Sequence, residues 1–393
     1  MSNLRDEYLQ KHWSAYPEMP KGALKWGRVA LAIQHLSELS FKDAPNILAR
    51  DVLKDGDLVA LMPENQIILL APNLTERLAQ SEQWHEHKKW QEFLAQVRSF
   101  FREKQFQDVK TPSLVVCPGT EPSLEVFETT FRLDSKTTKY FLPTSPELNL
   151  KKMLCEGAEK IFEIASVFRN GEKTTRHDPE FTMLEWYRAF TNLSTIKADV
   201  VELTRTMAEQ LKVDRPREVL TFSVSDLFKK YCDFDLKLET SIGELKDLAK
   251  RLAIDVSAAT CIDDYFYLIF IDKIENKWPQ DCLVFVEKYP PYQAALARLG
   301  SDGWAERFEV YWRGFELGNA FYELNDPIIQ KQRALEDLEK KKAQGKTELK
   351  LDDNFFSALE FGLPPSSGIA VGLERLYMAL TGIREISELK RIF

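Results

Sequence analysis

The sequence lacks the residue patterns on which secreted, membrane and metal-ribbon proteins depend. Its 393 residues include only five cysteines, without a CxxC pair: Cys117, Cys155, Cys232, Cys261 and Cys282. Such scattered cysteines favour reduced thiols over a disulfide framework or a zinc ribbon. No apolar run approaches the roughly 20 residues of a membrane helix. The charged N-terminus also does not resemble a signal peptide. We therefore expect a cytoplasmic protein without a membrane partner.

Positive charge is also in deficit. Lys and Arg number 53 against 61 Asp and Glu, which gives a formal net charge of −8. This balance argues against a general nucleic-acid coat protein, although a local basic patch remains compatible with it. The length predicts two or three domains and is ample for a large core.

The predicted secondary structure of the chain changes near residue 80. Before it, strand-like runs at residues 27–36, 50–62 and 65–73 surround a turn signal at Lys54-Asp55-Gly56. They predict a small β-rich, OB-like or barrel-like module over residues 1–80. A long amphipathic helix follows from Glu82, and residues 82–393 are predicted to form the second domain. Mostly helical patterns at about 213–280 predict a helical insertion in it.

The stretch FRNGEKTTRHDPEFTMLEWY, residues 168–187, joins a strand-like run to a charged loop and a second strand. In the second strand, the period of two places Phe181, Met183, Glu185 and Tyr187 on one face. Together with Arg169, this face suits a ligand with a phosphate, a flat ring and an amine. From these residues alone, the alternative is a half-buried hairpin with an ion pair.

A second group of polar residues lies in RFEVYWRGFELGNAFYELNDP, residues 307–327. A tight turn at Arg313-Gly314 would place Glu309 opposite Gly318, so that Glu309 and Glu316 become diagonal neighbours. Two unpaired acids at that separation repel each other unless a cation lies between them, and Mg²⁺ with phosphate oxygens is the natural occupant. The alternative is a charged strand surface.

Two further segments suit a ligand. TSPELNLKKML predicts a helix start with Ser145 as the N-cap and Pro146 at the first helical position. GIAVGLERLYMAL, residues 368–380, runs from a glycine-bearing strand into a helix whose first turn carries Arg375, a forked donor for phosphate. Junctions of this second kind are common, so the segment is weak evidence by itself.

Taken in order, FFREKQFQDVKTP, FRNGEKTTRHDPEFTMLEWY and GIAVGLER resemble motifs 1, 2 and 3 of the class II aminoacyl-tRNA synthetases. The resemblance covers roughly residues 85–393. It is to the lysyl type, and most closely to the truncated paralogues that attach β-lysine to elongation factor P. It implies an α+β fold with an antiparallel sheet flanked by helices, behind a small N-terminal β-rich module. It also implies a homodimer formed through motif 1.

The resemblance assigns roles to individual residues. Arg169 and Arg375 would be catalytic, as clamps on the phosphates of ATP. The ATP site would comprise Arg169, Asn170, Glu172, His177, Asp178, Phe181, Glu316, Leu317, Gly372 and Arg375. The amino-acid site would comprise Ser145, Pro146, Glu147, Glu185, Tyr187, Asn319, Glu323 and Ala370. Glu309 and Glu316 would hold Mg²⁺.

The chain departs from the family pattern in motif 2 and near the other motifs, at Gly171 followed by Glu172, and at Asp178, Ala320 and Glu374. The implied activity is ATP-dependent activation of lysine or β-lysine and transfer to a lysine side chain of elongation factor P. Ala370, where lysyl-tRNA synthetases usually have glycine, favours the paralogue. Two alternatives remain open: a shortened lysyl-tRNA synthetase that charges tRNA, and a catalytically silent paralogue acting as a binding subunit.

Overall fold

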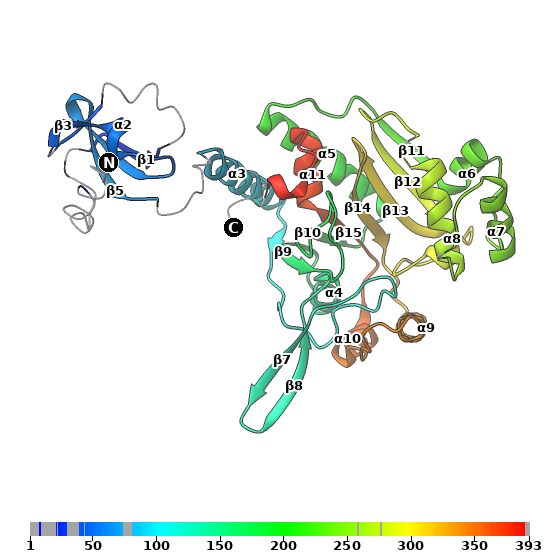
Figure 1. The fold of residues 1–393 in the computed structure, drawn as a ribbon. Coiled ribbons are helices and arrows are strands. Elements are labelled where there is room, and N and C mark those ends of the chain that lie inside the picture. The colour runs from blue at the N-terminus through cyan, green and yellow to red at the C-terminus, as the bar shows by residue number, and fades with distance from the viewer. Residues whose placement is uncertain are drawn as a thin grey trace. The chain divides into compact units, whose positions relative to one another are not determined.

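The computed structural model describes residues 8, 21, 23–29, 39–42, 44–73, 81–257, 259–275 and 277–389. The chain forms two compact units, one of Met1–Trp90 with Arg391–Phe393 and one of Gln91–Lys390. Figure 1 shows the fold of each unit.

The first unit contains a five-stranded sheet of order β1-β4-β5-β2-β3. Its elements are β1 (Lys25–Arg28), β2 (Ser40–Phe41), β3 (Ala44–Leu48), α2 (Ala49–Val52), β4 (Leu58–Met62) and β5 (Gln66–Ala71). The predicted turn is present, because Gly56 has φ of 86° and the amides of Lys54 and Asn73 donate to the buried Asp57 carboxylate. The run at 50–62 is not a single strand, since it begins in α2. Most of the run predicted over 27–36 lies outside the described residues.

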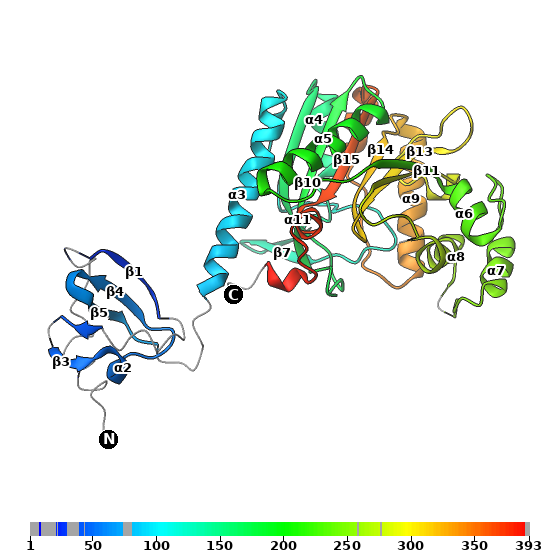
Figure 2. The same cartoon turned by 90° about the horizontal axis from the view of Figure 1, so that it is seen from above.

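The second unit is built on an eight-stranded sheet of order β11-β12-β13-β14-β15-β10-β9-β6 (Figure 2). Its strands are β6 (Gln107–Asp108), β9 (Lys160–Phe168), β10 (Glu180–Ala189), β11 (Val219–Ser223), β12 (Leu283–Tyr289), β13 (Ala305–Trp312), β14 (Phe315–Tyr322) and β15 (Ser366–Gly372). Pairing is antiparallel throughout except between β11 and β12 and between β6 and β9. The expected α+β fold with an antiparallel sheet is therefore confirmed.

Helices cover this sheet on both faces. Those that bear on the argument are α3 (Ser81–Glu103), α4 (Glu147–Cys155), α5 (Leu193–Leu211), α9 (Pro327–Ala343), α10 (Asp353–Gly362) and α11 (Leu373–Thr381). Between β11 and β12 lie α6 (Val224–Cys232), α7 (Ile242–Arg251) and α8 (Ile262–Ile269). The five residues of β11, which the helical patterns around them did not indicate, attach this helical segment to the sheet edge. A separate hairpin joins β7 (Glu128–Leu133) to β8 (Lys136–Phe141).

The core beneath α3 depends on aromatic packing. The ring of Phe101 in α3 lies 4.9 Å from that of Phe162 and 5.0 Å from that of Trp186, and all three side chains are fully buried. Phe162 and Trp186 are cross-strand partners in β9 and β10. Because neighbouring residues in a strand point to opposite faces, this packing leaves Glu185 and Tyr187 on the other face.

We expect Phe101→Ala to lower the free energy of unfolding of the second unit by about 3–5 kcal/mol, because it removes a fully buried ring that neighbours cannot refill. Phe361→Ala is the matched control, since that ring is 77% exposed and its loss should change stability by less than about 0.5 kcal/mol. Denaturant unfolding followed by circular dichroism measures both. Equal effects of the two substitutions would contradict this account of the core.

Candidate active site

Residues far apart in the sequence meet in one row that crosses the large sheet. Glu185 of β10 pairs with Ala370 of β15, Ala370 pairs with Asn319 of β14, and Asn319 pairs with Glu309 of β13. Side chains in such a row share one face of the sheet. Four predicted site residues from three separate segments of the sequence are thus brought together by strand register.

The hairpin of β13 and β14 differs from prediction by one residue. Its turn lies at Arg313 and Gly314, which both have positive φ, and Tyr311 pairs with Glu316 as expected. A bulge between Val310 and Tyr311 then shifts the register, so that Glu309 faces Asn319 and not Gly318. An extra residue of this kind leaves no periodic trace in the sequence.

Glu309 is also not the unpaired acid that we expected. Arg307 donates to Glu309 Oε1 at 2.5 Å, and the hydroxyls of Tyr289 and Tyr311 donate to Oε2 at 2.6 and 2.5 Å. Arg307 further donates to Asn319 Oδ1 at 3.0 Å, which fixes the orientation of that amide. The expectation that Glu309 is unpaired was wrong, because it considered only the two acids and not the donors on neighbouring strands. The assignment of Glu309 and Glu316 to Mg²⁺ stays a prediction.

Glu316 is the more open of the two acids, with 38% of its side chain exposed. Enclosure of its carboxyl and the negative charge of Glu309 raise the pKa of Glu316. Because more than a third of the Glu316 side chain is exposed, the charge of Glu309 contributes more to this shift than desolvation does. Two mutually repelling carboxylates fit a shared divalent cation. Within the described residues, no group of three or more His, Cys, Asp or Glu residues is placed to hold a metal ion.

Two arginines, Arg169 and Arg375, lie at one end of the site. We call it the phosphate end, because guanidinium groups suit phosphate oxygens. Arg375 Nη1 donates to Glu316 O at 3.1 Å and approaches Glu316 Oε2 at 3.4 Å. The guanidinium of Arg169 lies 5.2 Å from the ring centroid of Phe181, while its Nε is buried without a hydrogen-bond partner. A buried donor without a partner is costly, and a phosphate oxygen would satisfy it.

The charged loop between β9 and β10 reaches Arg375 through His177. The Nη2 of Arg375 contacts His177 Nε2, and His177 Nδ1 lies 2.8 Å from Thr174 Oγ1. A guanidinium only donates, so Nε2 accepts and the ring is neutral with its proton on Nδ1. Burial and the positive charge of Arg375 lower the pKa of His177, whereas the charge of Glu172 opposes them. Glu172 therefore lies close enough to His177 to affect its charge.

Asn170, Asp178, Leu317 and Gly372 occupy supporting positions around this end. Asn170 pairs with Glu125 through a backbone bridge, and its Nδ2 donates to Val126 O at 3.4 Å. Asp178 is half-buried in the loop. Leu317 is buried in β14, and Gly372 pairs with Met183 immediately before α11. These placements put the predicted ATP-site residues on elements that border Arg169 and Arg375.

The carboxylate end of the site is centred on Glu185. Ser145 donates to Glu185 Oε1 at 2.5 Å, and Tyr187 donates to Oε2 at 3.3 Å. Burial and the charge of Glu147 raise the pKa of Glu185 well above its usual value. The Tyr187 ring lies against Gly368, where an added Cβ would come within 2.3 Å of Cδ1 and Cε1. Only glycine fits there, a constraint that the sequence analysis did not identify.

The start of α4 also differs slightly from prediction. The helix begins at Glu147 with Pro146 as the N-cap, one residue later than expected. Ser145 Oγ accepts from the amide of Glu147 at 2.9 Å while its proton goes to Glu185. Ser145 therefore joins the helix start to the strand, which a capping role alone would not do.

A buried lysine lies among the acids of this end. Lys151 Nζ is 2.5 Å from Glu147 Oε1 and 2.6 Å from Glu323 Oε2, and its side chain is 1% exposed. The contact with Glu323 has ion-pair distance but not hydrogen-bond geometry, so neither Glu323 oxygen has a well-directed donor. Burial raises the pKa of Glu323 to about 8, although Lys151 opposes this. Sequence analysis missed Lys151; its spacing of four residues from Glu147 on a helix was the available signal.

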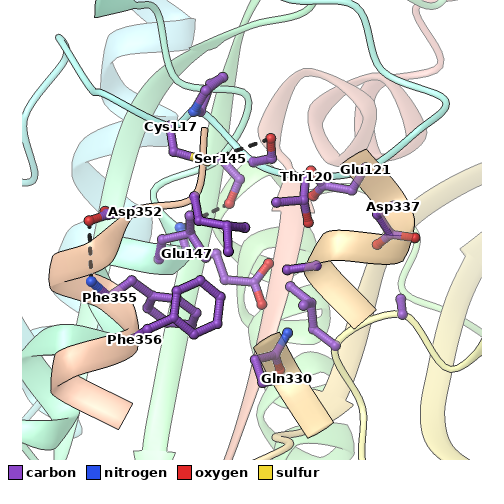
Figure 3. Close-up of a pocket in the computed structure, with 17 residues that line it drawn as sticks. Cys117, Thr120, Glu121, Ser145, Glu147, Gln330, Asp337, Asp352, Phe355 and Phe356 are labelled. Atoms are coloured by element: carbon purple, nitrogen blue, oxygen red, sulfur yellow. Dashed lines mark hydrogen bonds between the residues drawn. The ribbon is translucent and has the colours of Figure 1, made fainter. Parts of the chain in front are cut away.

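A cavity adjoins Ser145 and Glu147 (Figure 3). Its walls come from residues 117–121 and from α4, α9 and α10, with Phe355 and Phe356 on the α10 side. The buried Gln330 amide oxygen in its wall has no hydrogen-bond partner. Burial and the charge of Glu147 raise the pKa of Glu121, which also lines the cavity and which the sequence analysis did not single out.

Comparison with known proteins agrees with this geometry. Residues 77–391 match the family "tRNA synthetases class II (D, K and N)". Similar proteins include the elongation factor P–(R)-β-lysine ligase of Hamiltonella defensa, 33% identical over 76% of this chain and 91% of that protein. The ligases of the same name from Buchnera aphidicola (strain APS) and Klebsiella pneumoniae (strain 342) are 35% and 34% identical, over 75% of this chain and 91% and 90% of their own lengths. Among the helices described, none is long and apolar enough to cross a membrane.

We expect His177 to titrate below its ordinary pKa of 6.5 and Arg375→Gln to raise that pKa. Because folding lowers this pKa, the neutral ring stabilises the loop fully above pH 6.5, and the contribution is lost as the pH falls through the folded-state value. NMR titration of the ring protons, assigned with His177→Gln, measures the shift. An unchanged His177 pKa in the Arg375 variant would contradict the contact.

Proposed function

Because the chain belongs to the class II tRNA synthetases (D, K and N) and, within them, to the elongation factor P–(R)-β-lysine ligases, we propose that it activates lysine or β-lysine with ATP and transfers the aminoacyl group to a lysine side chain of elongation factor P. It is an ATP-dependent ligase. The observation that carries the proposal is the arrangement of one sheet face, with guanidinium groups at one end and buried carboxylates at the other.

The phosphate end suits in-line attack of the substrate carboxylate on the α-phosphate of ATP, which forms an aminoacyl-adenylate and releases pyrophosphate. The acceptor amine would then attack the acyl carbon of the adenylate and release AMP. Arg169 would bind the α-phosphate through its unpartnered Nε, with Phe181 stacked on the adenine. Arg375 would leave its contact with His177 to hold the γ-phosphate. These groups supply alignment and charge stabilisation, so no side-chain nucleophile is required.

Magnesium, when bound, neutralises phosphate charge. Glu316 is its more accessible ligand, and Glu309 would contribute after losing one of its present donors. The carboxylate end would bind the substrate's ammonium groups through Glu147, Glu185 and Glu323. Glu147 and Glu323 already contact one ammonium group, that of Lys151, and Glu185 is a buried acid.

Ala370 supports a preference for β-lysine. It lies between Glu185 and Asn319 in the row of residues that crosses the sheet. Its methyl group there would reduce the space beside the amino group of the bound substrate. A substrate with its amino group one carbon further along the chain avoids this methyl group. The name of the relatives favours the same substrate and a protein acceptor over tRNA.

We further propose a cytoplasmic homodimer formed through the motif 1 segment, α3 and β6.

ATP–pyrophosphate exchange with lysine and β-lysine tests the activation step. We expect Arg169→Gln and Arg375→Gln each to lower the exchange rate by about 10²–10³-fold, as for removal of single groups that stabilise charge in a transition state. Arg132→Gln, on the exposed β7 strand, is the control and should be fully active. Absence of exchange by the wild-type protein with every lysine analogue would instead favour the silent paralogue.

Purified elongation factor P and lysine tRNA, offered together with radiolabelled lysine or β-lysine, test the acceptor. We expect label on the protein, and we expect Ala370→Gly to shift the preference towards α-lysine by no more than roughly 10- to 200-fold, the discrimination available from a methylene-sized change. Label on tRNA alone would overturn the proposed acceptor. An unchanged substrate ratio would exclude Ala370 as the cause of selectivity.

A further inference from the structure

A cation, the ammonium group of Lys151, is already present at the carboxylate end of the site. It contacts Glu147 and Glu323, two of the acids that we propose bind the substrate. Lys151 projects from α4 and is 1% exposed, while Glu323 is fully buried and Glu147 is 12% exposed. Burying an ammonium group is costly unless carboxylates pair with it. A buried lysine at this position is therefore tied to the two acids and not to general packing.

The geometry leaves the other oxygens of the same carboxylates for a ligand. Lys151 contacts Glu147 Oε1 and Glu323 Oε2. Glu323 Oε1 is buried and has no hydrogen-bond partner. A buried acceptor without a donor is expected to be satisfied when a ligand binds. The incoming ammonium group would thus bind beside Lys151 and need not displace it.

The charges of the pocket match a substrate with two ammonium groups. Glu147, Glu185 and Glu323 together carry up to three negative charges, and Lys151 offsets one of them. When all three acids are ionised, the remainder equals the charge of the two ammonium groups of lysine or β-lysine. Without Lys151, Glu147 and Glu323 would repel each other and the pocket would hold one charge too many.

We propose that Lys151 is a positioning residue for amino-acid selection: it holds Glu147 and Glu323 in place and sets the pocket charge for a diamino acid. This inference rests on the proposed function. It extends that function to a residue that the sequence analysis did not include among those that bind the amino-acid substrate. Lys151 acts through the two acids and does not itself touch the reacting atoms.

Lys151→Met removes the charge and retains the length of the side chain. We expect this variant to raise the KM for the amino acid about 10²-fold or more, since removing one partner of a buried ion pair leaves the other charges uncompensated. The KM for ATP should be unchanged. Lys151→Arg keeps the charge and should recover most of the loss. Lys152→Met is the matched control, because the neighbouring Lys152 pairs with Asp352 of α10 and with neither acid of the pocket.

The pH dependence separates this role from a structural one. Glu147 and Lys151 face Glu323 from α4, and Glu185 and Tyr187 complete the charged surroundings from β10. Substrate binding needs the Glu323 carboxylate, whose pKa is raised to about 8, so kcat/KM for the amino acid should rise with pH through this value. Loss of Lys151 raises that pKa further and should move the midpoint to higher pH. Lys152→Met should keep the wild-type midpoint.

Calorimetric binding of lysine and β-lysine gives a readout that requires no catalysis. If the wild-type protein binds neither, the proposed function fails before Lys151 is tested. If it binds and the Lys151→Met variant has the same affinity and pH midpoint, the inference is overturned. If the Met variant does not fold, as judged by circular dichroism, the same measurements on Lys151→Gln decide. Weakened binding with a displaced midpoint, recovered in Lys151→Arg, supports the proposal.

Discussion

The site depends on the alternation of side chains across an antiparallel sheet whose register the core fixes. Trp186 packs against Phe101 on one face, and its neighbour Glu185 accepts from Ser145 on the other. A slip of one residue in β10 would bury Glu185 among aromatic rings and expose Trp186, so core packing and site geometry share one cause. The same register carries the row onward through Ala370 and Asn319 to Glu309. A rigid sheet therefore positions groups that the sequence keeps far apart.

The two ends of the site carry charges of opposite sign that are only partly compensated in the free protein. At the phosphate end, Arg375 pairs with Glu316, whereas Arg169 Nε is buried without a hydrogen-bond partner. At the carboxylate end, burial and the charge of Glu147 raise the pKa of Glu185 and of Glu323, and Lys151 offsets only part of the negative charge. Both ends are costly in the free protein, and both costs fall when a ligand with phosphates at one end and ammonium groups at the other binds. Such incomplete compensation is expected of a binding site and not of a structural ion-pair network.

Much of this arrangement could be predicted from the sequence, because it follows from local patterns. The strands of motif 2, the turn at Arg313-Gly314 and the pairing of Tyr311 with Glu316 follow from a period of two and from turn chemistry. The bulge after Val310 could not be predicted, because the side-chain alternation of the sequence looks regular before and after the one inserted residue. The donors to Glu309 and the partners of Lys151 come from other strands and helices, so only the three-dimensional structure shows that these charges are compensated.

Of the departures from the family pattern, Gly171 and Asp178 lie in the loop between β9 and β10, whereas Ala320 lies in β14 and Glu374 in α11. Ala320 pairs with Phe308 and Ile369 and is fully buried on the face opposite Asn319, so its methyl group does not narrow the substrate platform. Glu374 accepts from the amide of Thr182 with both carboxylate oxygens at 2.9 Å, which ties the first turn of α11, and hence Arg375, to β10. Gly171 has φ of 80°, a conformation that suits glycine and turns the loop before Glu172. Because the sheet groups remain in register, a difference in activity arising from these substitutions is expected in how the motif 2 loop closes on ATP and not in how the platform is built.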